Sequence, residues 1–94
     1  MRISPIHREI LTRELRAADP VGRVYLFGSR VMDERRGGDI DLFFETSRDF
    51  SMKEILTLEY RLSSQCGERV DLVVKSIGEP DQPIHEIARR GVRL

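Results

Sequence analysis

The length, charge and cysteine content of the chain set the first limits on what the protein can be. Its 94 residues allow one small domain, residues 1–94, and its 16 Lys and Arg balance 16 Asp and Glu, which argues against direct binding of nucleic acid. A single cysteine excludes an internal disulfide, and the short apolar runs exclude a membrane span, so we expect a soluble protein of the cytoplasm.

Signals for the ends of helices and strands divide the chain into alternating elements. Ser4 and Pro5 begin a first helix, which ends before Asp19 and Pro20. Predicted strands follow at 24–27, 40–45 and 69–75, with predicted helices within 30–38, from the cap Ser51 to about Cys66, and at 83–90. This order predicts an α+β fold in which helices pack on one face of a small mixed sheet of three or more strands.

Aspartates on two of the predicted strands are candidate metal ligands. Asp39 and Asp41 are two positions apart, so their side chains project from one face of the strand, opposite to the apolar side chains that face the helices. Asp71 can join them if its Val-rich strand lies alongside. Carboxylates this close repel one another unless a cation neutralises them, and Mg²⁺ suits such oxygen ligands. On their own, Asp39 and Asp41 would be better interpreted as solvated residues on the open face of a sheet, so the metal-site interpretation depends on Gly28, Ser29 and Asp71 as well.

The turn after the first strand is a candidate phosphate site. Gly28 lets the backbone approach a ligand closely, and Ser29 stands at a predicted helix N-terminus, where free N–H groups favour an anion. Arg30 follows as a candidate phosphate contact. The same residues would also form an ordinary turn and helix cap, so the functional interpretation depends on the aspartates.

Together these motifs resemble the nucleotidyltransferases of the DNA polymerase β superfamily. The resemblance comprises Gly28-Ser29, the Asp39-x-Asp41 pair and Asp71 on a Val-rich strand, and it covers roughly residues 5 to 94. It is closest to the minimal nucleotidyltransferase (MNT) domains, stand-alone proteins of about this size. The resemblance implies the polymerase β-like fold and transfer of a nucleoside monophosphate from a nucleotide such as ATP to a hydroxyl group.

Roles for individual residues and a partner follow from the same resemblance. Asp39, Asp41 and Asp71 would ligate two Mg²⁺ ions and form the catalytic centre, while Gly28, Ser29 and Arg30 would bind the phosphates of ATP. Many MNT proteins are antitoxins whose partner is a HEPN-type toxin, which some of them inactivate by adding AMP to a tyrosine. A partner or a second copy is expected to complete the site of so small a domain.

The segment after Arg30 departs from the family pattern. Val31, Met32 and Asp33 replace the family's Ala-Arg-Gly, so a basic residue is lost and an acid appears near the phosphate site. Two alternatives to a transferase therefore stay open: an antitoxin that neutralises its partner by direct contact, and a nucleotide or metal sensor. Among the remaining candidates, we expect Cys66 in the core and His85 at the surface.

Overall fold

The computed structural model describes residues 3–28 and 39–94, and it confirms the predicted α+β fold. Its elements, in chain order, are α1 (Pro5–Ala18), β1 (Arg23–Phe27), β2 (Ile40–Glu45), α3 (Met52–Cys66), β3 (Val70–Lys75), α4 (Pro83–Arg89) and β4 (Val92–Arg93). The short strand β4 was not predicted, and the helix predicted within 30–38 lies outside the described residues. In the described part of the chain, no helix has the length and apolar character needed to cross a membrane.

The helix ends form where the capping residues predicted them. Ser4 caps α1 by accepting a hydrogen bond from the His7 backbone N–H at 3.0 Å. Ser51 forms a reciprocal capping box with Glu54, each side chain accepting from the other's backbone N–H. These bonds satisfy amide groups that have no partner within the helix, so α1 and α3 have fixed starting points.

The sheet is mixed, with strand order β3-β2-β1-β4. Strand β2 pairs antiparallel with β1 and parallel with β3, and β4 pairs antiparallel with β1. Parallel neighbours need a crossover connection, which α3 provides between β2 and β3. The aspartate-bearing strands β2 and β3 are therefore adjacent, as the sequence prediction required, with β2 inside the sheet and β3 at its edge.

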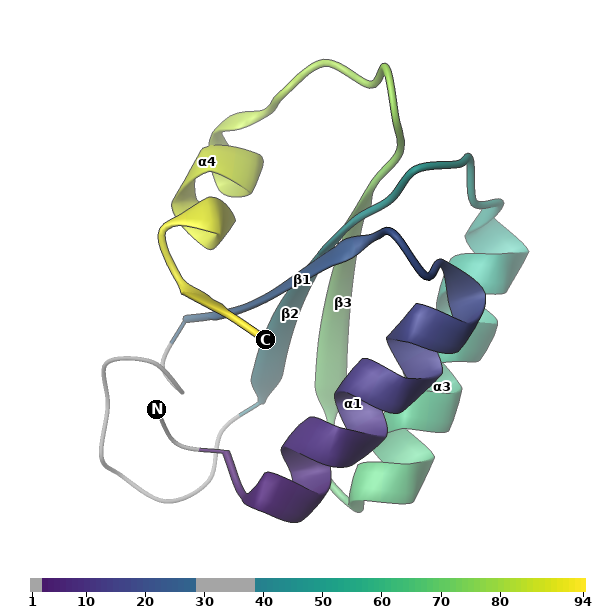
Figure 1. Ribbon diagram of the computed structural model, residues 1–94, viewed down its shortest axis with the longest axis vertical. Helices are drawn as coiled ribbons and strands as arrows, with labels where there is room; N and C mark the ends of the chain where they lie inside the picture. The colour runs from purple at the N-terminus through teal and green to yellow at the C-terminus, as the bar shows by residue number, and fades with distance from the viewer. Residues whose placement is uncertain (1–2, 29–38) are drawn as a thin grey trace.

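The main core lies between the sheet and the pair of helices α1 and α3 (Figure 1). Ile40, Leu42 and Phe44 of β2 are completely buried on this face, because alternate residues of a strand point the same way. The helices contribute Leu11, Leu15, Leu62 and Cys66, the last confirmed as a core residue at 7% exposure. Burial raises the pKa of the Cys66 thiol.

Helix α4 lies across the other face of the sheet, whereas α1 and α3 share the face predicted for the helices (Figure 1). There the ring of Phe43 stacks between Tyr25, at 5.8 Å between centroids, and His85, at 5.3 Å. His85 is 4% exposed, so its predicted surface position was wrong. Its Nδ1 accepts a hydrogen bond from the Gln82 backbone N–H at 3.0 Å, which leaves the ring proton on Nε2.

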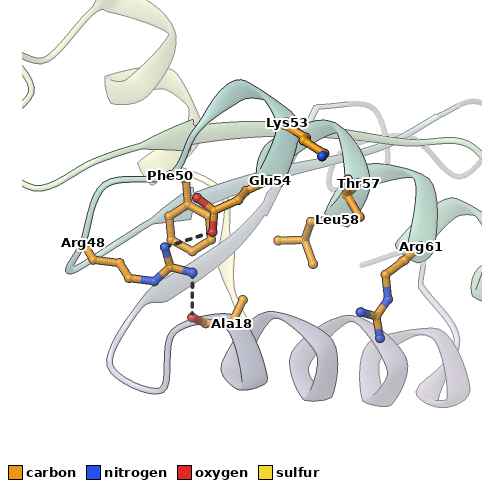
Figure 2. A pocket seen from close by; sticks show the side chains of 8 residues that line it. All are labelled: Ala18, Arg48, Phe50, Lys53, Glu54, Thr57, Leu58 and Arg61. Carbon is orange, nitrogen blue, oxygen red and sulfur yellow. Dashed lines mark hydrogen bonds and ion pairs between the residues drawn. The ribbon is translucent and has the colours of Figure 1, made fainter.

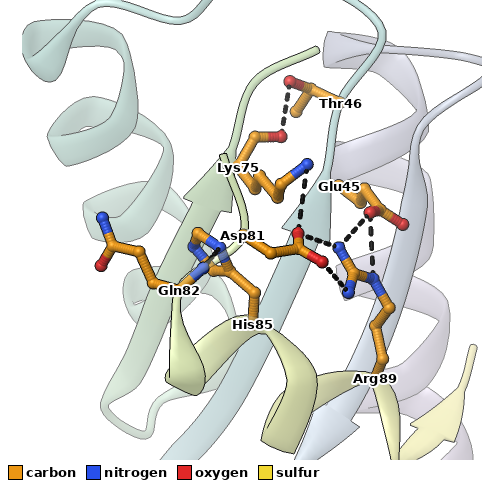
Figure 3. Close-up of polar contacts among 7 residues, drawn as sticks. All are labelled: Glu45, Thr46, Lys75, Asp81, Gln82, His85 and Arg89. Atoms are coloured by element: carbon orange, nitrogen blue, oxygen red, sulfur yellow. Dashed lines mark hydrogen bonds and ion pairs between the residues drawn. The ribbon is translucent and has the colours of Figure 1, made fainter. Parts of the chain in front are cut away.

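A network of charges attaches α4 to the far end of the same face (Figure 3). Arg89 donates to Glu45 on β2 at 2.7 Å and to Asp81 at 2.6 Å, and Lys75 on β3 contacts Asp81 at 3.3 Å. The hydrogen bonds from Arg89, reinforced by Lys75, lower the pKa of Asp81 to about 2. The network thus connects the loop before α4, the helix itself and two strands.

The outer edge of β3 is covered by side chains of α3. Glu59 accepts a hydrogen bond from the Leu72 backbone N–H at 2.8 Å, and Ser63 accepts one from the Val70 N–H at 2.9 Å. In a parallel pair, alternate residues direct their N–H groups away from the neighbouring strand, so these two amides would otherwise lack a partner.

Candidate active site

Two of the three predicted aspartates are direct neighbours across the parallel strands. Asp41 of β2 and Asp71 of β3 are register partners, so their side chains leave the sheet on the same face. Asp39 lies immediately before β2, two positions from Asp41. The side chains of Asp39 and Asp71 are 44% and 37% exposed, so solvent reaches both. The structure therefore gathers carboxylates from two strands at one end of the sheet.

Gly28 lies directly against this group. Its φ of +77° belongs to the left-handed region, which glycine adopts far more readily than other residues. A Cβ atom at this position would lie 2.3 Å from the Asp41 Oδ2 atom. A side chain is excluded at position 28 both by backbone conformation and by contact, so the turn after β1 packs against the Asp41 carboxylate.

The carboxylates of the site repel one another, and the effect falls on Asp41. Partial burial, followed by the negative charges of Asp71 and Asp39, raises the pKa of Asp41. The ionised form of Asp41 is therefore disfavoured in the folded protein. A cation placed among the three groups would relieve that repulsion.

Arg69 is a member of this cluster that the sequence did not indicate. Its Nε atom lies 3.2 Å from Asp71 Oδ1 and 3.8 Å from Asp39 Oδ2. The sequence did contain one indication of this contact: Arg69 is two residues before Asp71, so both side chains project from the same face of extended chain. An arginine at the start of a strand is more often fully solvated, so the spacing alone did not predict the contact, and the structure was needed to show it.

The chemistry of the donor set fits magnesium. Carboxylate oxygens are ligands that Mg²⁺ prefers, and because Gly28 has no side chain the turn after β1 packs directly against the Asp41 carboxylate. Within residues 3–28 and 39–94, however, no three His, Cys, Asp or Glu side chains converge closely enough to hold a metal as they stand. The ligand roles of Asp39, Asp41 and Asp71 therefore remain predictions.

The phosphate side of the site is described in part. Gly28 is the last described residue before the gap, and Ser29 and Arg30 lie outside the described residues, as do Val31, Met32 and Asp33. The predicted phosphate roles of Gly28, Ser29 and Arg30 stay predictions.

A surface hollow lies elsewhere on the molecule, away from the aspartate cluster. It measures about 260 Å³ and lies between the end of α1 and the first turns of α3 (Figure 2). Arg48 lies over the Phe50 ring at 3.8 Å and contacts Glu54 at 3.2 Å. Of the predicted site residues that the structure describes, namely Gly28, Asp39, Asp41 and Asp71, none lines this hollow. The aspartate cluster remains the candidate site.

A mixed sheet that brings aspartates of two parallel strands beside a glycine turn is the arrangement expected of a nucleotidyltransferase domain. The sequence matches the family described as "Polymerase beta, Nucleotidyltransferase" over residues 9–94, and the chain belongs to that family. No curated protein sequence matches the chain.

The structure is similar to crystal structures of toxin–antitoxin proteins. A toxin–antitoxin with AMP-PNP matches with a TM-score of 0.63 and 28% identity, over 70% of this chain and 55% of that chain. The toxin–antitoxin MntA–HepT matches with a TM-score of 0.73 over 96% of this chain and 70% of that one, and its 18% identity shows the fold alone.

A further similar structure is a mutant toxin–antitoxin in which two aspartates are replaced by glutamate. It matches with a TM-score of 0.61 and 26% identity, over 72% of this chain and 55% of that chain. This chain therefore spans little more than half the length of the chains matched in this structure and in the AMP-PNP structure.

Proposed function

We propose that this protein is a magnesium-dependent nucleotidyltransferase that transfers AMP from ATP to a hydroxyl group of a partner protein, a HEPN-type toxin. The observation that carries the proposal is the register of Asp41 with Asp71, with Asp39 beside them and Gly28 against Asp41. Membership of the nucleotidyltransferase family supports the reaction class. Similarity to toxin–antitoxin structures, one of them with AMP-PNP, supports the partner and the nucleotide.

The proposed roles of the three carboxylates are those that the family resemblance implies. Asp39, Asp41 and Asp71 would hold magnesium, and Asp71, the register partner of Asp41, would also act on the attacking hydroxyl. Magnesium, when bound, neutralises the phosphates and stabilises charge on the transferring phosphoryl group. The acceptor oxygen forms a bond to the α-phosphorus, the bond to the bridging oxygen breaks and pyrophosphate leaves. The hydroxyl proton passes to the Asp71 carboxylate.

A partner chain would complete this site. The side chains of Asp39 and Asp71 are 44% and 37% exposed, so a group presented from outside the domain can approach them. An acceptor protein would present its hydroxyl there, either in a hetero-oligomer with the toxin or through a second copy of this chain.

Transfer of label from α-labelled ATP to a co-expressed toxin tests the proposal. We expect label on the toxin with the wild-type chain and magnesium, and none with Asp39→Asn/Asp41→Asn. Transfer that persists in the double variant would exclude the carboxylate mechanism. A chain with Asp49→Asn serves as the matched control, because Asp49 is an exposed acid outside the cluster.

The second candidate function is an antitoxin that neutralises its partner by contact alone. Two observations favour it: Val31-Met32-Asp33 departs from the family pattern, and the described carboxylates do not converge on a metal-sized centre. Toxin neutralisation that survives Asp39→Asn/Asp41→Asn, with no label transfer by the wild type, would support this function in place of the first.

A further inference from the structure

Arg69 bridges two carboxylates that the proposed function assigns to magnesium. Its Nε atom is 3.2 Å from Asp71 on its own strand and 3.8 Å from Asp39 on the neighbouring segment. We propose that Arg69 is an internal counter-ion of the site, which neutralises Asp39 and Asp71 in the metal-free protein and competes with the divalent cation for them. This inference rests on the proposed function, since it concerns the same carboxylates.

The backbone of Arg69 is fixed while its side chain is free to move. The Arg69 carbonyl accepts a hydrogen bond from the Ile40 N–H at 2.9 Å, which holds the start of β3 against β2. The Arg69 side chain is 73% exposed, so its guanidinium can leave the carboxylates by rotation about side-chain bonds. Exchange of the guanidinium for a metal therefore needs no rearrangement of the sheet.

The counter-ion contact also gives a reason why the carboxylates do not form a finished metal site. A guanidinium is larger than a magnesium ion and binds oxygens at hydrogen-bond distance, whereas Mg²⁺ requires oxygens at about 2.1 Å. A pair of carboxylates that binds a guanidinium is therefore spaced more widely than a pair that holds a metal ion. Within the described residues, no group of three potential ligands is arranged to hold a metal ion as it stands.

The ion pairs of Arg69 with Asp39 and Asp71 are weak enough for a metal ion to displace the guanidinium. An exposed ion pair changes an equilibrium by about fivefold at most, because water screens both charges. A divalent cation that contacts several carboxylates at once binds much more strongly than one exposed guanidinium. Arg69 would therefore weaken metal binding by a modest factor without preventing it.

Mn²⁺ titrations of the wild type and of Arg69→Gln, followed by electron paramagnetic resonance without nucleotide, test the inference. We expect Arg69→Gln to bind Mn²⁺ about two- to fivefold more tightly, with the difference shrinking as salt is raised. Arg61→Gln is the matched control, because it removes the same charge from an exposed arginine that pairs with Glu14 elsewhere on the molecule. That variant should bind Mn²⁺ as the wild type does.

Thermal unfolding in EDTA supplies a second measurement. Arg69→Gln should unfold at a lower temperature than the wild type in EDTA, because its carboxylates have lost their counter-ion, and added Mn²⁺ should raise its unfolding temperature by more. An arginine with a purely structural role would instead lower both the stability and the metal affinity.

The outcomes separate this inference from the proposed function. If the wild type binds Mn²⁺, Asp41→Asn does not, and Arg69→Gln binds no more tightly than the wild type, the counter-ion inference is wrong and the proposed site stands. If neither the wild type nor Arg69→Gln binds Mn²⁺, the metal site itself is wrong and both proposals fail. Tighter binding by Arg69→Gln than by Arg61→Gln supports both.

Discussion

Asp41 and Asp71 are register partners in the parallel pair β2–β3, so two acids distant in the sequence lie side by side on one face of the sheet. Each additionally has a distinct neighbour: Gly28 packs against Asp41, and Arg69 contacts Asp71. The pKa of Asp41 is raised by burial and by the charges of Asp71 and Asp39. This pair is the part of the structure on which the predictions about function depend.

Replacing Asp41 by Asn should affect function and stability in opposite directions. Loss of a metal-binding carboxylate should lower label transfer by about a hundredfold or more, which is the effect that loss of one oxyanion-hole donor has in other enzymes. Loss of a like charge should raise the unfolding temperature in EDTA at neutral pH, because the folded protein no longer contains the repelling trio. Differential scanning fluorimetry in EDTA checks the second effect, and a destabilised variant would contradict it.

Replacing Gly28 by Ala should disrupt the site through a direct contact. The new Cβ would lie 2.3 Å from Asp41 Oδ2, so the carboxylate must move, and we expect Mn²⁺ affinity to fall more than about tenfold. Gly78→Ala is the matched control, because Gly78 has a similar φ of +81° with nothing within 4 Å of the added atom. Both variants should lose about 1 kcal/mol of stability from backbone strain. Equal Mn²⁺ affinity in the two variants would contradict the prediction.

The Asp81 network should give the protein a stability contribution that disappears in acid. Because Arg89 and Lys75 lower the pKa of Asp81 from 3.8 to about 2, the folded state holds the ionised form more strongly than the unfolded state does. The contribution is fully present above pH 3.8 and is lost as the pH falls towards about 2. Urea unfolding should show Asp81→Ala less stable than the wild type at pH 7, with the difference shrinking in acid.

The control for this prediction is Asp49→Ala, which removes an exposed acid outside the network. It should change the free energy of unfolding much less than Asp81→Ala does at neutral pH. A difference between Asp81→Ala and the wild type that stays constant down to the lowest pH would show that the network contributes no ion pairing.

Replacing Glu59 by Ala should destabilise the fold at the edge of the sheet. The change leaves the buried Leu72 N–H without its acceptor at 2.8 Å, which should cost about 1–3 kcal/mol in the free energy of unfolding. Glu59→Gln keeps an acceptor oxygen and should recover most of the loss. Hydrogen exchange at Leu72 should accelerate in the Ala variant, and unchanged exchange would show that the amide does not depend on Glu59.

Local signals made much of the fold predictable. Ser4, Ser51 and Gly67 mark helix ends through bonds or backbone conformations confined to a few residues, so the sequence carries them directly. Strand β4 has two residues, too few to show any periodicity. The burial of His85 depends on α4 lying over Phe43, a tertiary contact that no local pattern encodes.

The candidate site was predictable to a similar extent. The spacing of Asp39 and Asp41 and the Val-rich strand around Asp71 indicated three acids, on condition that the two strands were neighbours. In the structure, β2 and β3 are parallel neighbours and Asp41 is in register with Asp71, so this condition is met. The contact of Arg69 depends on the path of a long, exposed side chain, and such paths are set by neighbouring charges rather than by sequence spacing.

The side chains of Glu59 and Ser63 that occupy the amides of β3 also bear on how this molecule can join others. At one border of the sheet, the outward amides of Val70 and Leu72 already have acceptors on α3, and the opposite border is β4, a strand of two residues. Lengthening the sheet with a foreign strand is therefore unfavourable at either margin. Binding partners are therefore expected to contact side chains on the surface of this domain and not the backbone of its sheet edges. Surface side chains can be substituted individually, so the domain can change its binding specificity without changing its fold.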